Sequence, residues 1–171
     1  ANAAWSAEKG KELEAYLARG GGFIVMHMAV NGAEAPESLA DQIGLAWRPG
    51  KSKFRHGALD VTFSQGSANP ITAGFDKLHF IDESYWDLIP GKVKADVLAT
   101  CEEEGHTQPL LWTTEHGKGR TFATIPAHYN WTLDDPLYRI LLLRGICWTA
   151  HQRTDRLNEL ATIGARVDPS K

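Results

Sequence analysis

The pattern of apolar and polar positions predicts a helix and then a buried strand near the start of the chain. Between residues 5 and 18, apolar side chains recur at near-helical spacing among Glu, Lys and Arg, which is typical of a surface helix. Three glycines at 20–22 end this pattern, as glycines commonly do after a helix. The unbroken apolar run at 23–26 follows, and such runs are typical of strands covered on both faces in a parallel sheet.

The rest of the chain is predicted to alternate between short strands and helices. We expect strands at 58–63, 78–83, 97–100, 110–112 and 121–125, and helices at 37–43 and 136–150. The last two strands flank glycines at 117 and 119, so they should pair antiparallel through a tight turn. Asp134 or Asp135 can cap the last helix, with Pro136 in its first turn. Residues 48–54 and 64–70 are expected to be loops.

Composition indicates one α/β domain over residues 1–151, followed by a polar tail or linker at 152–171. The chain has 171 residues, of which 43% are hydrophobic and 23% charged, and this is ordinary globular usage. A net charge of −3 with scattered Lys and Arg disfavours nucleic acid as a partner. The longest apolar runs fall short of the ~20 residues of a membrane span, and no secretory signal is recognised. The compartment is left open.

Reactive side chains follow three of the predicted strands. The strand at 23–26 leads into His27, the strand at 78–83 ends at Asp82 and Glu83, and the strand at 121–125 is followed by His128. Because ligands bind at the carboxyl ends of strands in open α/β sheets, these groups are expected to meet in one crevice. Two imidazoles and a carboxylate suit general acid/base catalysis or a divalent metal, zinc first. The alternative for each residue alone is a structural role as a hydrogen-bonded or capping group.

Aromatic residues and a further histidine lie close to these positions in the sequence. His56, in a predicted loop, is expected to enter the same cleft from the side. Tyr85, Tyr129 and Trp131 are candidate substrate-binding residues together with Asp82, since aromatic faces beside polar groups are a common way to hold sugar rings. Packing in the core or in an interface is the alternative for the aromatics, and a homo-oligomer or a neighbouring domain is an alternative partner.

Several catalytic motifs are absent from the sequence. It contains no GxSxG, P-loop or HExxH motif, and the glycines at 20–22 precede their strand, whereas a dinucleotide fingerprint follows one. The cysteines are only Cys101 and Cys147, too few for a disulfide framework. Cys101 precedes three glutamates, which raise a thiol pKa and oppose nucleophilic activation.

Six segments, taken in order, resemble the ThuA-like (trehalose utilisation) domain family. They are GGGFIVMH, FRHGALDV, NPITAGF, FIDESYW, PLLWTTEHGKGRTFATIPAH and LRGICW, and the resemblance runs from about residue 11 to 150. It implies a fold similar to class I glutamine amidotransferases: a flavodoxin-like three-layer sandwich with a mostly parallel sheet and an antiparallel hairpin near the C-terminal part. It also implies carbohydrate metabolism, involving a disaccharide or keto-sugar.

The resemblance carries over to particular residues of this chain. His27 stands where those amidotransferases have their nucleophilic cysteine, so their reaction is not expected here. The family pattern also covers His56, the Asp82–Glu83 pair with Tyr85, and His128. Two departures are that the chain is expected to lack the family's first strand, and that Ala127 precedes His128 where a glycine is usual.

Three functional hypotheses follow. The leading one is a carbohydrate-utilisation enzyme with His27, Glu83 and His128 as catalytic or metal-binding groups. The second is a non-catalytic sugar-binding or scaffold module of a larger protein. The third is a structural divalent-metal site made by the same residues. Because the sequence contains no HxxxH-type spacing, it does not identify a metal with certainty. It does not identify the substrate either.

Overall fold

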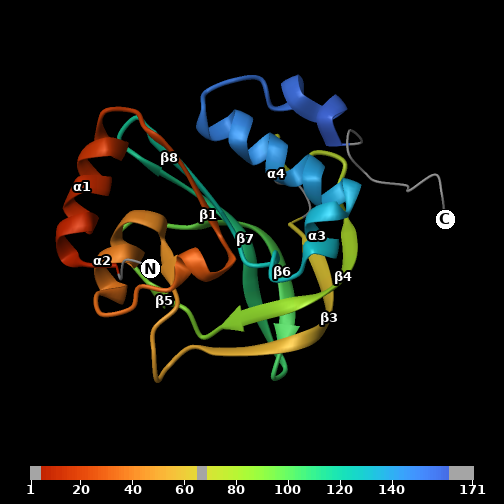
Figure 1. Ribbon diagram of the computed structural model, residues 1–171, viewed down its shortest axis with the longest axis horizontal. Helices are drawn as coiled ribbons and strands as arrows, with labels where there is room; N and C mark the ends of the chain where they lie inside the picture. Colours follow the sequence, from red (N-terminus) through yellow and green to blue (C-terminus); the bar gives the residue numbers. More distant parts are fainter. Residues whose placement is uncertain (1–4, 65–68, 162–171) are drawn as a thin grey trace.

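The computed structural model contains a six-stranded sheet with helices on both faces, and it describes residues 5–64 and 69–161 (Figure 1). The helices are α1 (Ala7–Ala18), α2 (Pro36–Ile43), α3 (Asn130–Asp134) and α4 (Pro136–Thr149), with 3₁₀ turns η1 (His27–Val30) and η2 (Thr154–Ala161). The strands are β1 (Gly22–Met26), β2 (Leu45–Ala46), β3 (Lys53–Phe63), β4 (Lys77–Trp86), β5 (Ile89–Pro90), β6 (Asp96–Glu103), β7 (His106–His116) and β8 (Gly119–Thr124).

The main sheet has the order β1-β8-β7-β6-β3-β4 and is mixed. Only β1 and β8 pair in parallel; the four other neighbouring pairs are antiparallel. The expectation of a mostly parallel sheet is therefore wrong, although the α/β class and the antiparallel pair around residues 117–119 are confirmed. The physical reason lies in the connections: β6–β7 and β7–β8 are joined by turns of a few residues, and such turns can link only antiparallel strands.

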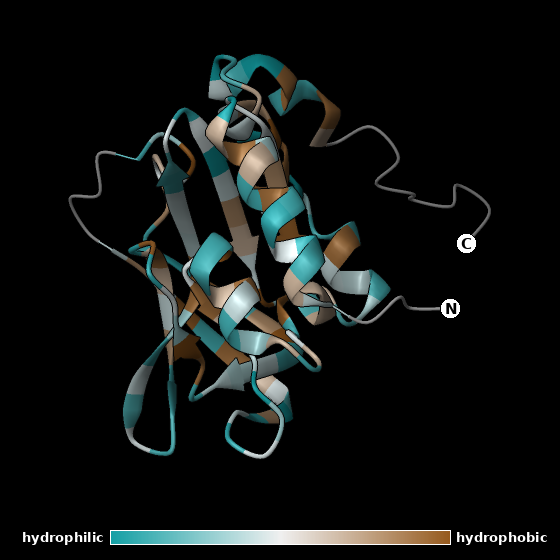
Figure 2. Ribbon diagram, turned by 90° about the vertical axis from the view of Figure 1, so that its left-hand side faces the viewer, coloured by the Kyte–Doolittle hydropathy of each residue, from teal (hydrophilic) through white to brown (hydrophobic). Residues whose placement is uncertain are grey.

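Helices cover the β1–β8–β7 part of the sheet on two sides. In Figure 1, α1 and α2 lie on one side of these strands and α4 lies on the other. The helices carry both hydrophilic and hydrophobic residues (Figure 2), as expected of helices with one buried side. Fully buried side chains such as Leu17, Val25, Phe122 and Leu141 join the layers in one core. This layered part holds β1 and β8 in a fixed position.

The predicted helices at 37–43 and 136–150 are confirmed. Helix α2 covers the predicted segment, and α4 begins at Pro136. Asp135 caps α4, because its side chain accepts hydrogen bonds from the backbone N–H groups of Leu137 at 2.8 Å and Tyr138 at 3.0 Å. Part of the predicted tail forms η2, which contacts α4; residues 162–171 of that tail lie outside the described residues.

The hairpin of β3 and β4 is longer than the sequence pattern predicts. Strand β3 begins at Lys53, so His56 lies within a strand and the prediction of a loop there is wrong. Strand β4 continues to Trp86, so Asp82 and Glu83 lie inside the strand and do not end it. The two strands pair in a register that sets His56 opposite Glu83. Much of the stretch 53–57 is solvent-exposed. Its sequence therefore lacks the alternation of apolar and polar residues by which a half-buried strand is recognised.

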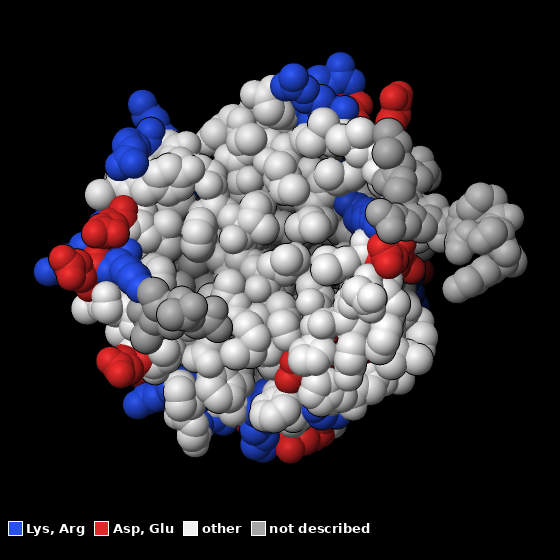
Figure 3. Space-filling model, in the orientation of Figure 1, with Lys and Arg blue, Asp and Glu red and all other residues white. Residues whose placement is uncertain are grey.

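The charge distribution on the surface and the length of the helices bear on binding to nucleic acid and on crossing a membrane. On the face shown in Figure 3, Lys and Arg side chains are interspersed with Asp and Glu around the rim, and the centre is uncharged. This face presents no continuous basic stripe. In the described part of the chain, no helix is both long enough and apolar enough to cross a membrane.

Candidate functional site

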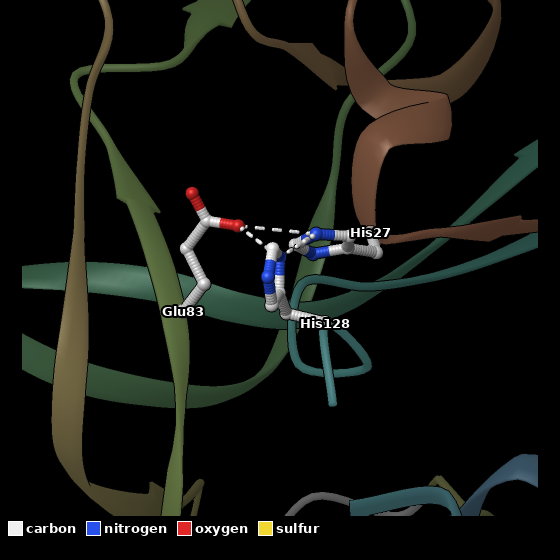
Figure 4. A group of neighbouring side chains, drawn as sticks. All are labelled: His27, Glu83 and His128. Atoms are coloured by element: carbon white, nitrogen blue, oxygen red, sulfur yellow. Dashed lines mark hydrogen bonds and ion pairs between the residues drawn. The ribbon is translucent and has the colours of Figure 1, made fainter. Parts of the chain in front are cut away.

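Three separate elements bring His27, Glu83 and His128 together (Figure 4). His27 is the first residue of η1, directly after β1, and His128 lies in the loop after β8. The parallel pairing of Met26 with Thr124 aligns the ends of these two strands, so both imidazoles leave the sheet at the same edge. Glu83 comes from β4 and points toward the two histidines (Figure 4).

The reactive atoms of the three side chains are within contact distance of one another. Glu83 Oε2 lies 3.1 Å from His27 Nε2 and 2.8 Å from His128 Nδ1. The two imidazole nitrogens are 3.0 Å apart. Glu83 is only 5% exposed, so these neighbours are its main polar partners.

The backbone fixes the orientation of the His27 ring. His27 has φ 51°, a left-handed conformation that turns the chain sharply at the end of β1. Its Nδ1 lies 3.0 Å from the carbonyl oxygen of Ile125. Because a carbonyl oxygen only accepts, Nδ1 carries the proton when the ring is neutral, and Nε2 is then an acceptor for the Nδ1–H of His128 or the Tyr85 hydroxyl.

Tyr85 supplies a proton donor to the cluster. Its hydroxyl lies 3.2 Å from both His27 Nε2 and Glu83 Oε2, and 3.0 Å from Met28 Sδ. Its ring stacks on His27 with centroids 5.1 Å apart. Burial, reinforced by the negative charge of Glu83, raises the pKa of Tyr85 well above its ordinary value of 10. The hydroxyl therefore stays protonated at physiological pH.

Asp82 lies beneath the cluster and does not line it. The residue is fully buried. Its Oδ1 accepts hydrogen bonds from the backbone N–H groups of Glu83 at 2.7 Å, Ala127 at 3.3 Å and His128 at 3.0 Å, and Oδ2 accepts one from the Thr132 hydroxyl. With both oxygens engaged, Asp82 positions the His128 loop. Asp82 was expected to contact the substrate, whereas in the structure it is buried and hydrogen-bonded to the protein itself.

His56 and Tyr129 form the exposed side of the cluster. His56 Nε2 lies 3.7 Å from Glu83 Oε1, and its Nδ1 lies 3.0 Å from the Tyr129 hydroxyl. Tyr129 stacks on Trp131 with centroids 4.1 Å apart. The Trp131 ring is 52% exposed, and its indole N–H donates to the Ile81 carbonyl at 2.7 Å. An aromatic row thus runs outward from the cluster to a fixed, exposed indole.

A small cavity of about 200 Å³ opens beside Glu83 and Tyr85. Its other lining residues are Met28, Asn31, Trp47 and Phe54. The sequence pattern did not single out Met28, Asn31 or Phe54. Met28 and Asn31 could have been found from their position within four residues of His27, just after the strand end. Phe54 was hidden because its strand was read as a loop.

Among the described residues, the larger cavities do not bring three His, Cys, Asp or Glu ligand atoms within 4.8 Å of one another, as the His27 cluster does. One of about 550 Å³ lies between α1, α2 and the β7–β8 hairpin, where Lys92 is paired with Asp41. Another of about 680 Å³ is lined by Arg144 and Arg153, but Arg144 donates to the carbonyls of Ile71 and Ala73 and Arg153 pairs with Asp155. Volume alone therefore does not identify the functional site.

Both cysteines are unsuited to nucleophilic chemistry. Cys101 and Cys147 are buried and free. Burial, with the nearby Glu103 carboxylate, raises the pKa of Cys101 to about 12, so its thiol is almost entirely protonated at neutral pH. Neither cysteine is among the residues that contact the His27 cluster.

Comparisons with known proteins agree on one family and one fold. Residues 1–149 match the family model described as trehalose utilisation. A ThuA-like protein from Parabacteroides merdae ATCC 43184 aligns with 88% of this chain and 68% of its own, at 22% identity and a TM-score of 0.66. A ThuA-like protein from Bacteroides uniformis ATCC 8492 aligns with 85% of this chain and 66% of its own, at 13% identity and a TM-score of 0.61.

The same fold occurs within a much longer protein. A β-galactosidase from Bacillus circulans sp. alkalophilus aligns with 85% of this chain but 21% of its own, at 13% identity and a TM-score of 0.57. At such identities the solved structures show a shared fold alone. No curated protein matches the chain.

Proposed function

Since the chain belongs to the ThuA family, whose model is described as trehalose utilisation, we propose that it is an enzyme that acts on a carbohydrate, a disaccharide or a keto-sugar, through His27, Glu83 and His128. The observation that carries the proposal is the meeting of three reactive atoms, from β4 and from the ends of β1 and β8, within 3.1 Å of one another.

The same atoms fit a divalent cation. Two imidazole nitrogens and one carboxylate oxygen are a ligand set of catalytic zinc sites, which leave a further position open. The hydrogen bond from His27 Nδ1 to the Ile125 carbonyl is the kind of outer contact that orients a metal-bound histidine. For His128 to bind the cation through Nδ1, the proton of its neutral ring must be on Nε2, so that Nδ1 has a free lone pair. When bound, a divalent cation would polarise a sugar oxygen.

In the absence of a cation, the protons of the cluster can also be assigned. The Tyr85 hydroxyl and the Nδ1–H of His128 are two donors, and they face two acceptors, His27 Nε2 and Glu83 Oε2. Donors and acceptors therefore balance when both imidazoles are neutral. A substrate hydroxyl that takes the place of one of these donors would give its proton to the lone pair of His27 Nε2.

Neighbouring residues would bind the substrate. His56 and Tyr129 stand at the exposed side of Glu83, and Trp131 offers a fixed aromatic face of the kind that stacks on sugar rings. Asp82 has a positioning role in this proposal, because its oxygens hold the backbone of the His128 loop. A cysteine-dependent amidotransferase reaction is not proposed, because the pKa of Cys101 is raised and its side chain is buried.

Turnover of a sugar panel tests the proposal. Disaccharides and their keto derivatives would be incubated with the protein and with its His27→Ala and His128→Ala variants; His106→Ala, an exposed histidine outside the cluster, is the matched control. We expect both cluster variants to lose at least about a hundredfold in kcat/KM, and the control to keep its activity. Saccharide binding with no turnover would favour a non-catalytic sugar-binding module. Unchanged turnover in both variants would exclude the proposed roles.

A further inference from the structure

We propose that the 200 Å³ cavity beside Glu83 and Tyr85 is a subsite for a single terminal sugar ring, with Phe54 and Trp47 as its apolar walls and Asn31 as a hydrogen-bond donor. This inference rests on the proposed function and adds to it the part of the substrate that the protein encloses.

The cavity adjoins the reactive atoms directly. Glu83 and Tyr85 are wall residues of the cavity and also members of the cluster. They lie two residues apart on β4, so their side chains leave the same face of the strand. Phe54 on β3 is paired with Tyr85 in the register of the hairpin. A ring held there would place its hydroxyl groups against the Glu83 carboxylate.

The walls have the mixed character of a sugar subsite. Met28, Trp47 and Phe54 supply apolar surface, which matches the C–H face of a pyranose ring. Phe54 is 56% exposed, and so is Met28. Large apolar side chains exposed together at the rim of a cavity commonly mark a binding site, because a ligand that covers them removes their apolar surface from water.

Two donors on the lining residues have no acceptor among the described residues. Asn31 Oδ1 accepts a hydrogen bond from the backbone N–H of Ala33 at 2.8 Å, which assigns the amide orientation and leaves Nδ2 as a free donor. The indole N–H of Trp47 is buried without a partner in the described part of the structure. Sugar hydroxyl oxygens are acceptors of the type that the Asn31 amide lacks.

The size of the cavity sets the length of substrate that it encloses. Pockets for drug-sized ligands measure roughly 300–1,000 Å³, so about 200 Å³ accommodates one ring and not two. The second ring of a disaccharide would remain outside, on the side of His56 and Tyr129. The protein would therefore recognise the end of a saccharide and not an internal unit.

Binding of glucose and trehalose by calorimetry tests the subsite. The variants are Phe54→Ala, Phe54→Trp and Asn31→Ser; serine can keep a hydrogen bond to the Ala33 N–H but lacks the amide donor. Ile146→Ala is the matched control, since Ile146 is 38% exposed on α4 and lines neither this cavity nor the His27 cluster. We expect Phe54→Ala and Asn31→Ser to lower the affinity for both sugars by on the order of tenfold. Phe54→Trp should keep the wild-type affinity, and the control should stay within about twofold of it.

The outcomes separate this inference from the function on which it rests. Turnover on the sugar panel with unchanged affinity in Phe54→Ala and Asn31→Ser would overturn the subsite alone. An equal loss in Ile146→Ala would also overturn it, because the effect would not be specific to the cavity. A wild-type protein that neither binds nor transforms any sugar would overturn both proposals. Thermal unfolding of each variant at the wild-type temperature would show that a loss of affinity is not a loss of fold.

Discussion

The buried carboxylate of Asp82 accepts a hydrogen bond from the backbone N–H of His128 at 3.0 Å. The residue that follows Asp82 on β4 is Glu83, so adjacent positions of one strand supply the central carboxylate and anchor the loop of the second imidazole. Through this contact one short, buried side chain ties the backbone of the His128 loop to β4, the strand that carries Glu83.

Replacement of Asp82 is expected to disturb stability and site geometry together. In Asp82→Asn one oxygen and the charge are lost while the shape is retained, so we expect the free energy of unfolding to fall by about 2–3 kcal/mol, since hydrogen bonds to charged groups contribute about 1.5–3 kcal/mol each. Urea unfolding measures this. Asp60→Asn, at an exposed position paired with His79, should change stability by less than about 0.5 kcal/mol. Equal losses in the two variants would contradict the anchoring role.

Ala127→Gly is expected to stabilise the protein. Ala127 has φ 138°, a left-handed conformation that favours glycine. Such strain costs about 1–3 kcal/mol, whereas the greater freedom of glycine in the unfolded chain offsets about 0.5–1 kcal/mol. We predict a net gain of about 1 kcal/mol in urea unfolding. The control is Ala150→Gly at φ −83°, which should lose stability; a loss of similar size at both positions would show that residue 127 is not strained.

Cys101 should resist alkylation in the native protein. With a pKa of about 12, about one thiol in ten thousand is ionised at pH 8, and the side chain is buried. Mass spectrometry after iodoacetamide treatment should find Cys101 unmodified in native protein and labelled in urea. Rapid native labelling would contradict its inert character and reopen a nucleophilic role.

Tyr85 should make folding less favourable at alkaline pH. Its pKa is raised in the folded protein by burial and by Glu83. Above the ordinary pKa of 10, the unfolded chain therefore loses a proton that the folded protein keeps, and stability declines as pH rises. Its contribution to stability is fully present below pH 10.

The variant Tyr85→Phe removes this contribution. Its unfolding free energy should decline less steeply between pH 10 and 12, by up to about 1.4 kcal/mol per pH unit. Urea unfolding at pH 9, 10, 11 and 12 measures the slopes. Parallel curves for the two proteins would show that Tyr85 ionises alike in the folded and unfolded states.

Much of the layered part of the fold could be predicted from local patterns. The helices at α2 and α4 and the β7–β8 hairpin carry their own signals: periodic apolar residues, Asp135 as a cap, and turn glycines. The sheet directions could not be predicted in the same way, because a short apolar strand such as β6 reads alike in parallel and antiparallel pairing. The length of the connection to the neighbouring strand decides between parallel and antiparallel pairing.

The grouping of His27, Glu83 and His128 could be predicted from the sequence, whereas most of the lining of the adjoining cavity could not. His27, Glu83 and His128 were found because each lies in or just beyond a readable strand. The strand-end argument was nevertheless incomplete, since Glu83 lies inside β4 and points toward the two histidines from there (Figure 4). Phe54 and Asn31 carry no sequence signal of their own; the register of β3 with β4 and the course of the chain after η1 bring them to the cavity.

That His27, Glu83 and His128 form one site is tested most directly by an anomalous-difference map from crystals grown with zinc chloride. We predict one strong peak about 2.0–2.2 Å from His27 Nε2, Glu83 Oε2 and His128 Nδ1, and its loss in crystals of His128→Ala. Peaks found only elsewhere on the protein, with the two imidazoles turned away from Glu83, would contradict a shared site.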